Sequence, residues 1–255
     1  MTLFTSEKQM TQKVTRLLII LACAGVLSLF TAAATPLPTC SNDWTIAQYI
    51  STYNPGGGCV IGDKIFSNFS YIGSGNNPVP GTDVVVGTLG PTGTGAAAVD
   101  SLFPSDIGLE FSASWTVPPG TSSDAAIGFE VTIGSGPLNI EDAGLVQTSG
   151  VTGTGVASVV EDGCSGAVFP CTQEWNVLTN NNSFAADTIF TPTGTISVSK
   201  DITVQSGSNG TATISLVQDV FSQTAVPEPR SLSLLLGFGL VAGLALKKKF
   251  QGVRS

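Results

Sequence analysis

The chain has 255 residues, of which 42% are hydrophobic, and it carries a formal net charge of −8 with no histidine. Without histidine the chain lacks the commonest general base and the commonest transition-metal ligand, so a Ser-His-Asp triad is excluded. Residues 35–225 hold sixteen acids against only Lys64 and Lys200, a net charge of −14. Phosphate recognition needs clustered basic residues, so nucleic acid is excluded as a partner.

The N-terminal segment has the three parts of a secretory signal peptide. Three basic residues precede an apolar run at 17–30, and Ala32 and Ala34 then form an A-x-A cleavage pattern. This pattern predicts a signal peptide over residues 1–34. The alternative is a permanent N-terminal anchor, for which fourteen apolar residues are few, because a membrane span needs about 20.

Residues 35–224 are expected to form one secreted, all-β domain that begins with a short helix. We expect the helix at 43–50, capped by Asn42 or Asp43, with Trp44, Ala47 and Ile50 on one face. Period-two alternation and intervening Gly, Pro, Asn and Ser turns then predict strands, at 59–66, 68–72, 83–89, 109–117, 126–133, 145–148, 155–160, 195–205 and 211–221. Many short strands separated by turns favour a β-sandwich of jelly-roll type.

Four cysteines remain after the signal peptide is removed, and an even number in an exported chain predicts disulfides. Three connectivities are open, and proximity in the sequence favours Cys40–Cys59 together with Cys164–Cys171. The rival interpretation is a four-cysteine zinc site. The spacings lack the C-x₂-C pattern and the compartment is oxidising, so we expect no metal there.

The C-terminal segment, residues 225–255, combines a proline motif, an apolar run and a basic cluster. Val226, Pro227, Glu228 and Pro229 come first, and an apolar run at 231–246 follows. A basic cluster lies at 247–254, with Lys247, Lys248, Lys249 and Arg254. Sixteen residues of helix span about 24 Å, slightly less than the hydrocarbon core, and snorkelling lysines supply the rest. The pattern predicts a single transmembrane helix at 231–246, with the three lysines stopping transfer on the cytoplasmic side and the secreted domain outside.

These three elements, in this order, resemble a PEP-CTERM sorting domain, and the resemblance covers about 30 residues. It implies that an exosortase-type enzyme recognises Val226–Pro229, that the helix anchors the protein transiently in the inner membrane, and that the released protein reaches the cell surface or the extracellular matrix. A permanent anchor is the alternative. Segments 40–70 and 196–202 also resemble exported proteins of this kind, which favours one domain spanning both.

The chain offers few candidates for chemistry. Paired acids suggest a glycosidase, the candidates being Glu110, Glu130, Glu141–Asp142, Glu161–Asp162 and Glu174. A solvated strand face explains them better. Without histidine, a serine nucleophile would need Lys64 or Lys200 as its base, and no motif supports that pair. The same acids leave a calcium site open as an alternative, but no D-x-[DN]-x-[DN]-G calcium loop is present, and we expect no cofactor.

Aromatic and threonine residues suggest binding functions instead. Trp115 and Trp175 are the candidate glycan contacts, although core packing is the commoner role of tryptophan. Thr-x-Thr occurs four times at irregular spacing, mostly as Thr-Gly-Thr, which is more typical of turns than of an ice-binding array. The sequence therefore predicts a non-catalytic surface or matrix protein. Alternatives are a carbohydrate-binding module for extracellular polysaccharide and, behind it, an ice-binding protein or a carbohydrate-active enzyme.

Overall fold

A computed structural model describes residues 35–90, 97–98, 106–166 and 173–225. The predicted signal peptide, the sorting motif, the apolar run at 231–246 and Cys171 lie outside the described residues. No helix within the described ranges is long and apolar enough to cross a membrane.

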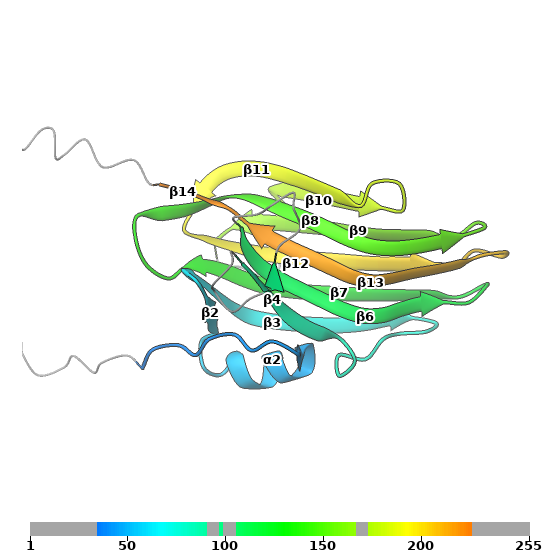
Figure 1. Cartoon of the computed structure of the whole chain (residues 1–255), viewed down its shortest axis with the longest axis horizontal. Coiled ribbons are helices and arrows are strands. Elements are labelled where there is room, and N and C mark those ends of the chain that lie inside the picture. The colour runs from blue at the N-terminus through cyan, green and yellow to red at the C-terminus, as the bar shows by residue number, and fades with distance from the viewer. Residues whose placement is uncertain (1–34, 91–96, 99–105, 167–172, 226–255) are drawn as a thin grey trace, which may run out of the picture. The chain divides into compact units, whose positions relative to one another are not determined.

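Two β-sheets make up the secreted domain, and the described residues place eight strands in one sheet and six in the other (Figure 1). All pairings are antiparallel except that of β5 with β4. The eight-stranded sheet contains β1 (Trp44–Thr45), β4 (Val85–Gly90), β5 (Ala97–Ala98), β6 (Ile107–Val117), β8 (Leu138–Thr152), β11 (Ala185–Thr193), β13 (Thr211–Phe221) and β14 (Gln223–Ala225). The six-stranded sheet contains β2 (Cys59–Ile61), β3 (Lys64–Gly75), β7 (Ser122–Ile133), β9 (Val156–Ser165), β10 (Trp175–Asn180) and β12 (Thr195–Gln205).

The chain changes sheet repeatedly between β6 and β13. Strands β6, β8, β11 and β13 belong to the eight-stranded sheet, whereas β7, β9, β10 and β12 belong to the six-stranded one. Each change of sheet turns the inward side chains of successive strands toward one another, so both sheets bury one face. The expected β-sandwich is confirmed at the level of two facing sheets.

Five phenylalanines join the two sheets at the centre of the core. The Phe129 ring on β7 lies 6.2 Å from that of Phe66 and 6.3 Å from that of Phe69, both on β3. From the opposite sheet, Phe111 and Phe221 approach the same ring at 6.0 and 6.2 Å. All five are buried, so aromatic packing across the interface holds the layers together.

Helix α2 (Ile46–Tyr53) confirms the expected helix but begins about one turn later and buries a different face. Thr45, rather than Asn42 or Asp43, caps it: its Oγ1 accepts from the Gln48 N–H at 3.3 Å, while the Thr45 N–H donates to Gln48 Oε1 at 2.8 Å. The delay arises because the backbone N–H of Asp43 is bonded to the Val86 carbonyl, which keeps the chain in β-pairing.

The buried face of α2 is formed by Ile46, Tyr49 and Tyr53 rather than by the expected Trp44, Ala47 and Ile50. The Tyr49 ring packs edge-on against Phe69 at 5.1 Å, and the helix therefore covers β3 (Figure 1). Tyrosine suits the buried face of α2 because its ring packs in the core while its hydroxyl reaches a polar partner at the edge.

Candidate functional site

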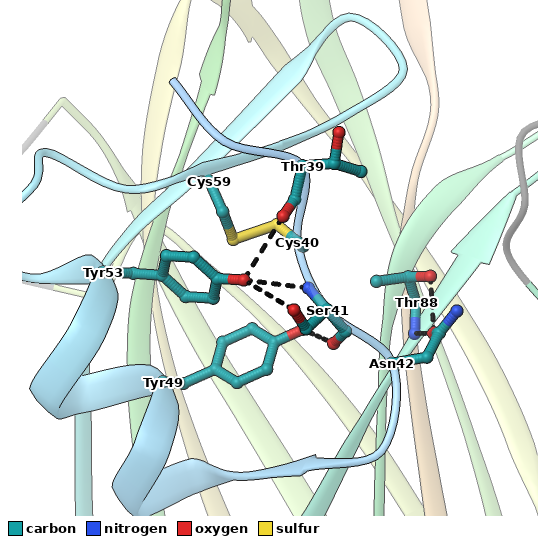
Figure 2. The surroundings of a disulfide bond; sticks show 8 residues. All are labelled: Thr39, Cys40, Ser41, Asn42, Tyr49, Tyr53, Cys59 and Thr88. Carbon is teal, nitrogen blue, oxygen red and sulfur yellow. Dashed lines mark hydrogen bonds between the residues drawn. A yellow bond between two sulfur atoms is a disulfide. The ribbon is translucent and has the colours of Figure 1, made fainter. Parts of the chain in front are cut away.

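A disulfide and two tyrosines fix the N-terminal segment to the sandwich (Figure 2). Cys40 and Cys59 are bonded, with their Cα atoms 4.8 Å apart, which confirms this predicted pair. The Tyr53 hydroxyl accepts from the Ser41 N–H at 3.0 Å and lies 3.2 Å from the Thr39 carbonyl oxygen. Burial, followed by the proximity of Tyr53, raises the pKa of Tyr49, whose hydroxyl donates to the Ser41 carbonyl. These contacts are those of a structural anchor.

Cys164 on β9 is also disulfide-bonded. Its expected partner, Cys171, lies outside the described residues, so the second predicted pair stays a prediction.

The two predicted glycan contacts occupy different places in the sandwich. Trp115 on β6 is fully buried in the core and offers no face to a ligand. Trp175 on β10 is 6% exposed, and its ring stacks on Phe190 of β11 with centroids 4.9 Å apart. It also covers Gly163, where an added Cβ would lie 1.8 Å from the indole. Core packing therefore explains Trp115 completely and most of the Trp175 side chain.

The Trp175–Phe190 stack forms the wall of an open depression of about 580 Å³. We call it the β10–β11 trough, and it is lined by Glu174, Trp175, Thr188, Ile189, Phe190 and Thr191. Strands β10 and β11 contact each other, and each is an edge strand of its own sheet. Ile189 is 77% exposed, while Leu178 on β10 and Phe184, just before β11, are 48% and 49% exposed. Few other large apolar side chains of the described residues are as exposed.

Glu174 is the carboxylate of the trough. It accepts hydrogen bonds from the Ser165 backbone N–H at 3.0 Å and from Ser165 Oγ at 2.8 Å. The backbone bond and then the hydroxyl bond lower its pKa. Glu174 is therefore held as a carboxylate, which suits it to accept hydrogen bonds from a ligand and not to donate a proton as a general acid.

The other candidate acids are dispersed. Glu110 and Glu130 alternate with core residues on β6 and β7, so each points to the outer face of its own sheet, on opposite sides of the sandwich. Glu130 accepts from Asn68 Nδ2 at 2.7 Å and lines a depression of about 370 Å³ with Asn54 and Ser70. The described residues contain no group of three or more acids and cysteines placed to hold a metal ion.

Glu161 is the exception, because it points inward. It lies on β9 beside Lys200 of β12, and Asp219 of β13 approaches from the other sheet. All three side chains are fully buried. Sequence reasoning considered Glu161 and Lys200 separately and missed Asp219. Period-two alternation in β12 could have indicated that Lys200 points inward. It shares one face of the strand with four residues that are all buried, Ile196, Val198, Ile202 and Val204.

No family model and no curated protein match the chain. Among solved structures, the carbohydrate-binding module TmCBM61, in complex with β-1,4-galactotriose, matches at 11% identity and a TM-score of 0.28 over 61% of this chain and 88% of that one. The enzymatically active domain of tailspike protein 4 from Bacteriophage CBA120 matches at 16% identity and a TM-score of 0.25, over 58% of this chain and 19% of that one. At these TM-scores neither likeness bears on ligand or activity.

Proposed function

We propose that this chain is an exported, non-catalytic protein of the cell surface or extracellular matrix, sorted by a PEP-CTERM tail. The observation that carries the proposal is the order of elements at the C-terminus: Val226–Pro229, then the apolar run at 231–246, then Lys247–Lys249. Proline disfavours helix in the residue before it, so we expect the motif to present Glu228 to a membrane enzyme next to the apolar run.

The described domain supports this placement without depending on the tail. The Cys40–Cys59 disulfide indicates an oxidising compartment. Each depression described above contains a single carboxylate, Glu174 in one and Glu130 in the other, whereas glycoside hydrolysis needs a pair about 5–10 Å apart. A binding or structural role therefore fits the domain better than catalysis.

Variants of the motif test the sorting step in the native host. Pro227→Ala with Pro229→Ala, and separately Glu228→Gln, are expected to keep the protein in the inner-membrane fraction, while the wild type reaches the surface or the medium. Ser231→Ala is the matched control, since it lies beside the motif but outside it, and it is expected to sort normally. Normal surface release of both motif variants would show that Val226–Pro229 is not recognised.

The β10–β11 trough favours a second function, glycan binding, within the same location. The exposed Ile189 side chain suits the C–H face of a sugar ring, and the Thr191 hydroxyl, two residues further along β11, suits its hydroxyl groups together with the Glu174 carboxylate. The high negative charge of the domain disfavours an anionic polymer, so a neutral polysaccharide is the expected class.

A pair of exposed isoleucines gives a matched test of this function. Ile189 lines the trough and is 77% exposed, whereas Ile72 on β3 is 68% exposed and lies on a different strand. In a pull-down with the host's neutral polysaccharide, Ile189→Ser is expected to weaken retention at least tenfold and Ile72→Ser to leave it unchanged. Equal retention of both variants, or no retention of the wild type, would remove the glycan-binding function and leave the sorting proposal untouched.

A further inference from the structure

A lysine and two acids meet in the interior of the sandwich, where charged groups are rarely found unpaired. We call Glu161, Lys200 and Asp219 the buried triad; all three side chains are 0% exposed. Lys200 is the register partner of Glu161 across β12 and β9, which places their side chains next to each other on the inward face. Asp219 is on β13 of the other sheet, so the triad joins the two sheets.

The contacts within the buried triad centre on the lysine nitrogen. Lys200 Nζ lies 2.9 Å from Asp219 Oδ2 and donates a hydrogen bond to Glu161 Oε2. Glu161 and Asp219 also share a side-chain hydrogen bond. One lysine is thus shared by two buried carboxyl groups, and removing these groups from water is costly.

The protonation of the triad follows from its burial. Burial raises the pKa of Glu161 well above its ordinary value, and the Asp219 charge adds to this while Lys200 opposes it. The raised pKa favours the protonated, neutral form of Glu161, which lowers the negative charge of the buried triad. Burial alone would lower the pKa of Lys200, but the charges of Asp219 and Glu161 together hold it above its ordinary value.

We propose that Lys200 and Asp219 condense into an intramolecular amide, with Glu161 as the proton-transfer residue. The Lys200 ammonium first passes a proton to the Asp219 carboxylate, which gives a neutral amine and a neutral carboxylic acid. Nζ then attacks Asp219 Cγ and the new N–C bond forms. Glu161 takes the second proton from nitrogen and gives its own to the departing Asp219 oxygen, which leaves as water when its C–O bond breaks. Glu161 ends as it began, protonated, and no oxidant or reductant takes part.

Three features of the site favour this reaction. Nζ and the carboxyl group are held in contact by two sheets, so the reaction has the high effective concentration of an intramolecular step. All three side chains are closed to bulk solvent, which opposes the reverse hydrolysis. The product replaces an ammonium and a carboxylate by a neutral amide, which removes the cost of burying both charges. The amide would join β12 to β13 and thus one sheet to the other.

Trypsin offers a direct test, because it does not cut after a lysine whose Nζ is acylated. Between Lys64 and Arg230 the chain has no lysine or arginine other than Lys200. The full-length chain is purified in detergent, reduced, denatured and digested. The amide predicts one fragment over 65–230, lighter than its sequence mass by one water, in place of fragments 65–200 and 201–230. Cleavage after Lys64, which is also buried in the fold, is the internal control for complete digestion.

Two variants complete the test. Lys200→Arg keeps the positive charge but cannot form this amide, and it is expected to be cut at position 200. Glu161→Gln keeps the shape but cannot exchange the protons, and at least a tenfold lower yield of the linked fragment is expected. Complete cleavage of the wild type after Lys200, with both fragments at their sequence masses, would overturn the proposal even if neither variant folds. A linked fragment in undiminished yield from Glu161→Gln would instead overturn the role of Glu161.

Discussion

Removing the Cys40–Cys59 disulfide should lower the stability of the domain by an amount that its geometry allows us to work out. The two cysteines are 19 residues apart. In the chain-entropy model, closing a loop of this length in the unfolded state stabilises the fold by about 3 kcal/mol at 25 °C. The hydrogen bonds of Tyr53 to Thr39 and Ser41 lie in the same tethered segment, so they are expected to weaken as well.

The assay is equilibrium unfolding in guanidinium chloride, followed by tryptophan fluorescence. Trp44 stacks on Tyr53 with ring centroids 5.6 Å apart and reports on the tethered segment, while Trp115 reports on the core. Two double variants lose the cross-link, one with both cysteines changed to alanine (Cys40→Ala, Cys59→Ala) and one with both changed to serine (Cys40→Ser, Cys59→Ser). The loss of unfolding free energy common to both variants measures the contribution of the disulfide. A shared loss below about 1 kcal/mol would refute the reasoning, because the loop-closure entropy would then have been offset elsewhere.

Two further perturbations test the core and its charges. Trp115→Ala leaves a large cavity between the sheets and is expected to cost about 3–5 kcal/mol in the free energy of unfolding, measured by the same titration; a loss under about 1 kcal/mol would contradict its place in the core. Burial, reinforced by Asp142 and opposed by Lys64, raises the pKa of Asp106 to about 6. The folded protein therefore binds more protons than the unfolded chain between pH about 4 and 6, and stability falls as pH rises through this window. The effect is below about 1 kcal/mol, because Asp106 is partly exposed and screened. Asp106→Asn should remove that part of the pH dependence, and an unchanged profile would contradict the shift.

The sandwich was predictable because apolar and polar residues alternate along most of its strands. Residues 109–117 and 126–133 show period two and form the inner strands β6 and β7. Strands β10 and β11 were missed, and with them the edge that carries the trough. In β11 half-buried and exposed side chains alternate over residues 186–191, but Thr188 is half-buried and Ile189 is exposed, so hydrophobicity does not follow the alternation. An edge strand such as β11 is identified by its hydrogen bonds to a neighbouring strand, and a single sequence does not show which strands pair.

The candidate sites were predictable only in part. The Cys40–Cys59 pair followed from proximity in the sequence, since a short loop limits the choice of partner. Trp115 and Trp175 were singled out for their chemistry, but their burial depends on which face of β6 and β10 turns inward. The buried triad brings together residues from β9, β12 and β13, and its third member comes from the opposite sheet. Strand alternation could have placed each charge inward, but only the packing of one sheet on the other brings them into contact.

The most direct test of the whole account is peptide mapping of the protein recovered from the outside of intact host cells. We expect peptides from residues 35–224, an intact Cys40–Cys59 disulfide, and no peptide from 231–255. Recovery of the chain from the cytoplasm with residues 1–34 attached and its cysteines reduced, or from the cell surface with 231–255 still present, would contradict it.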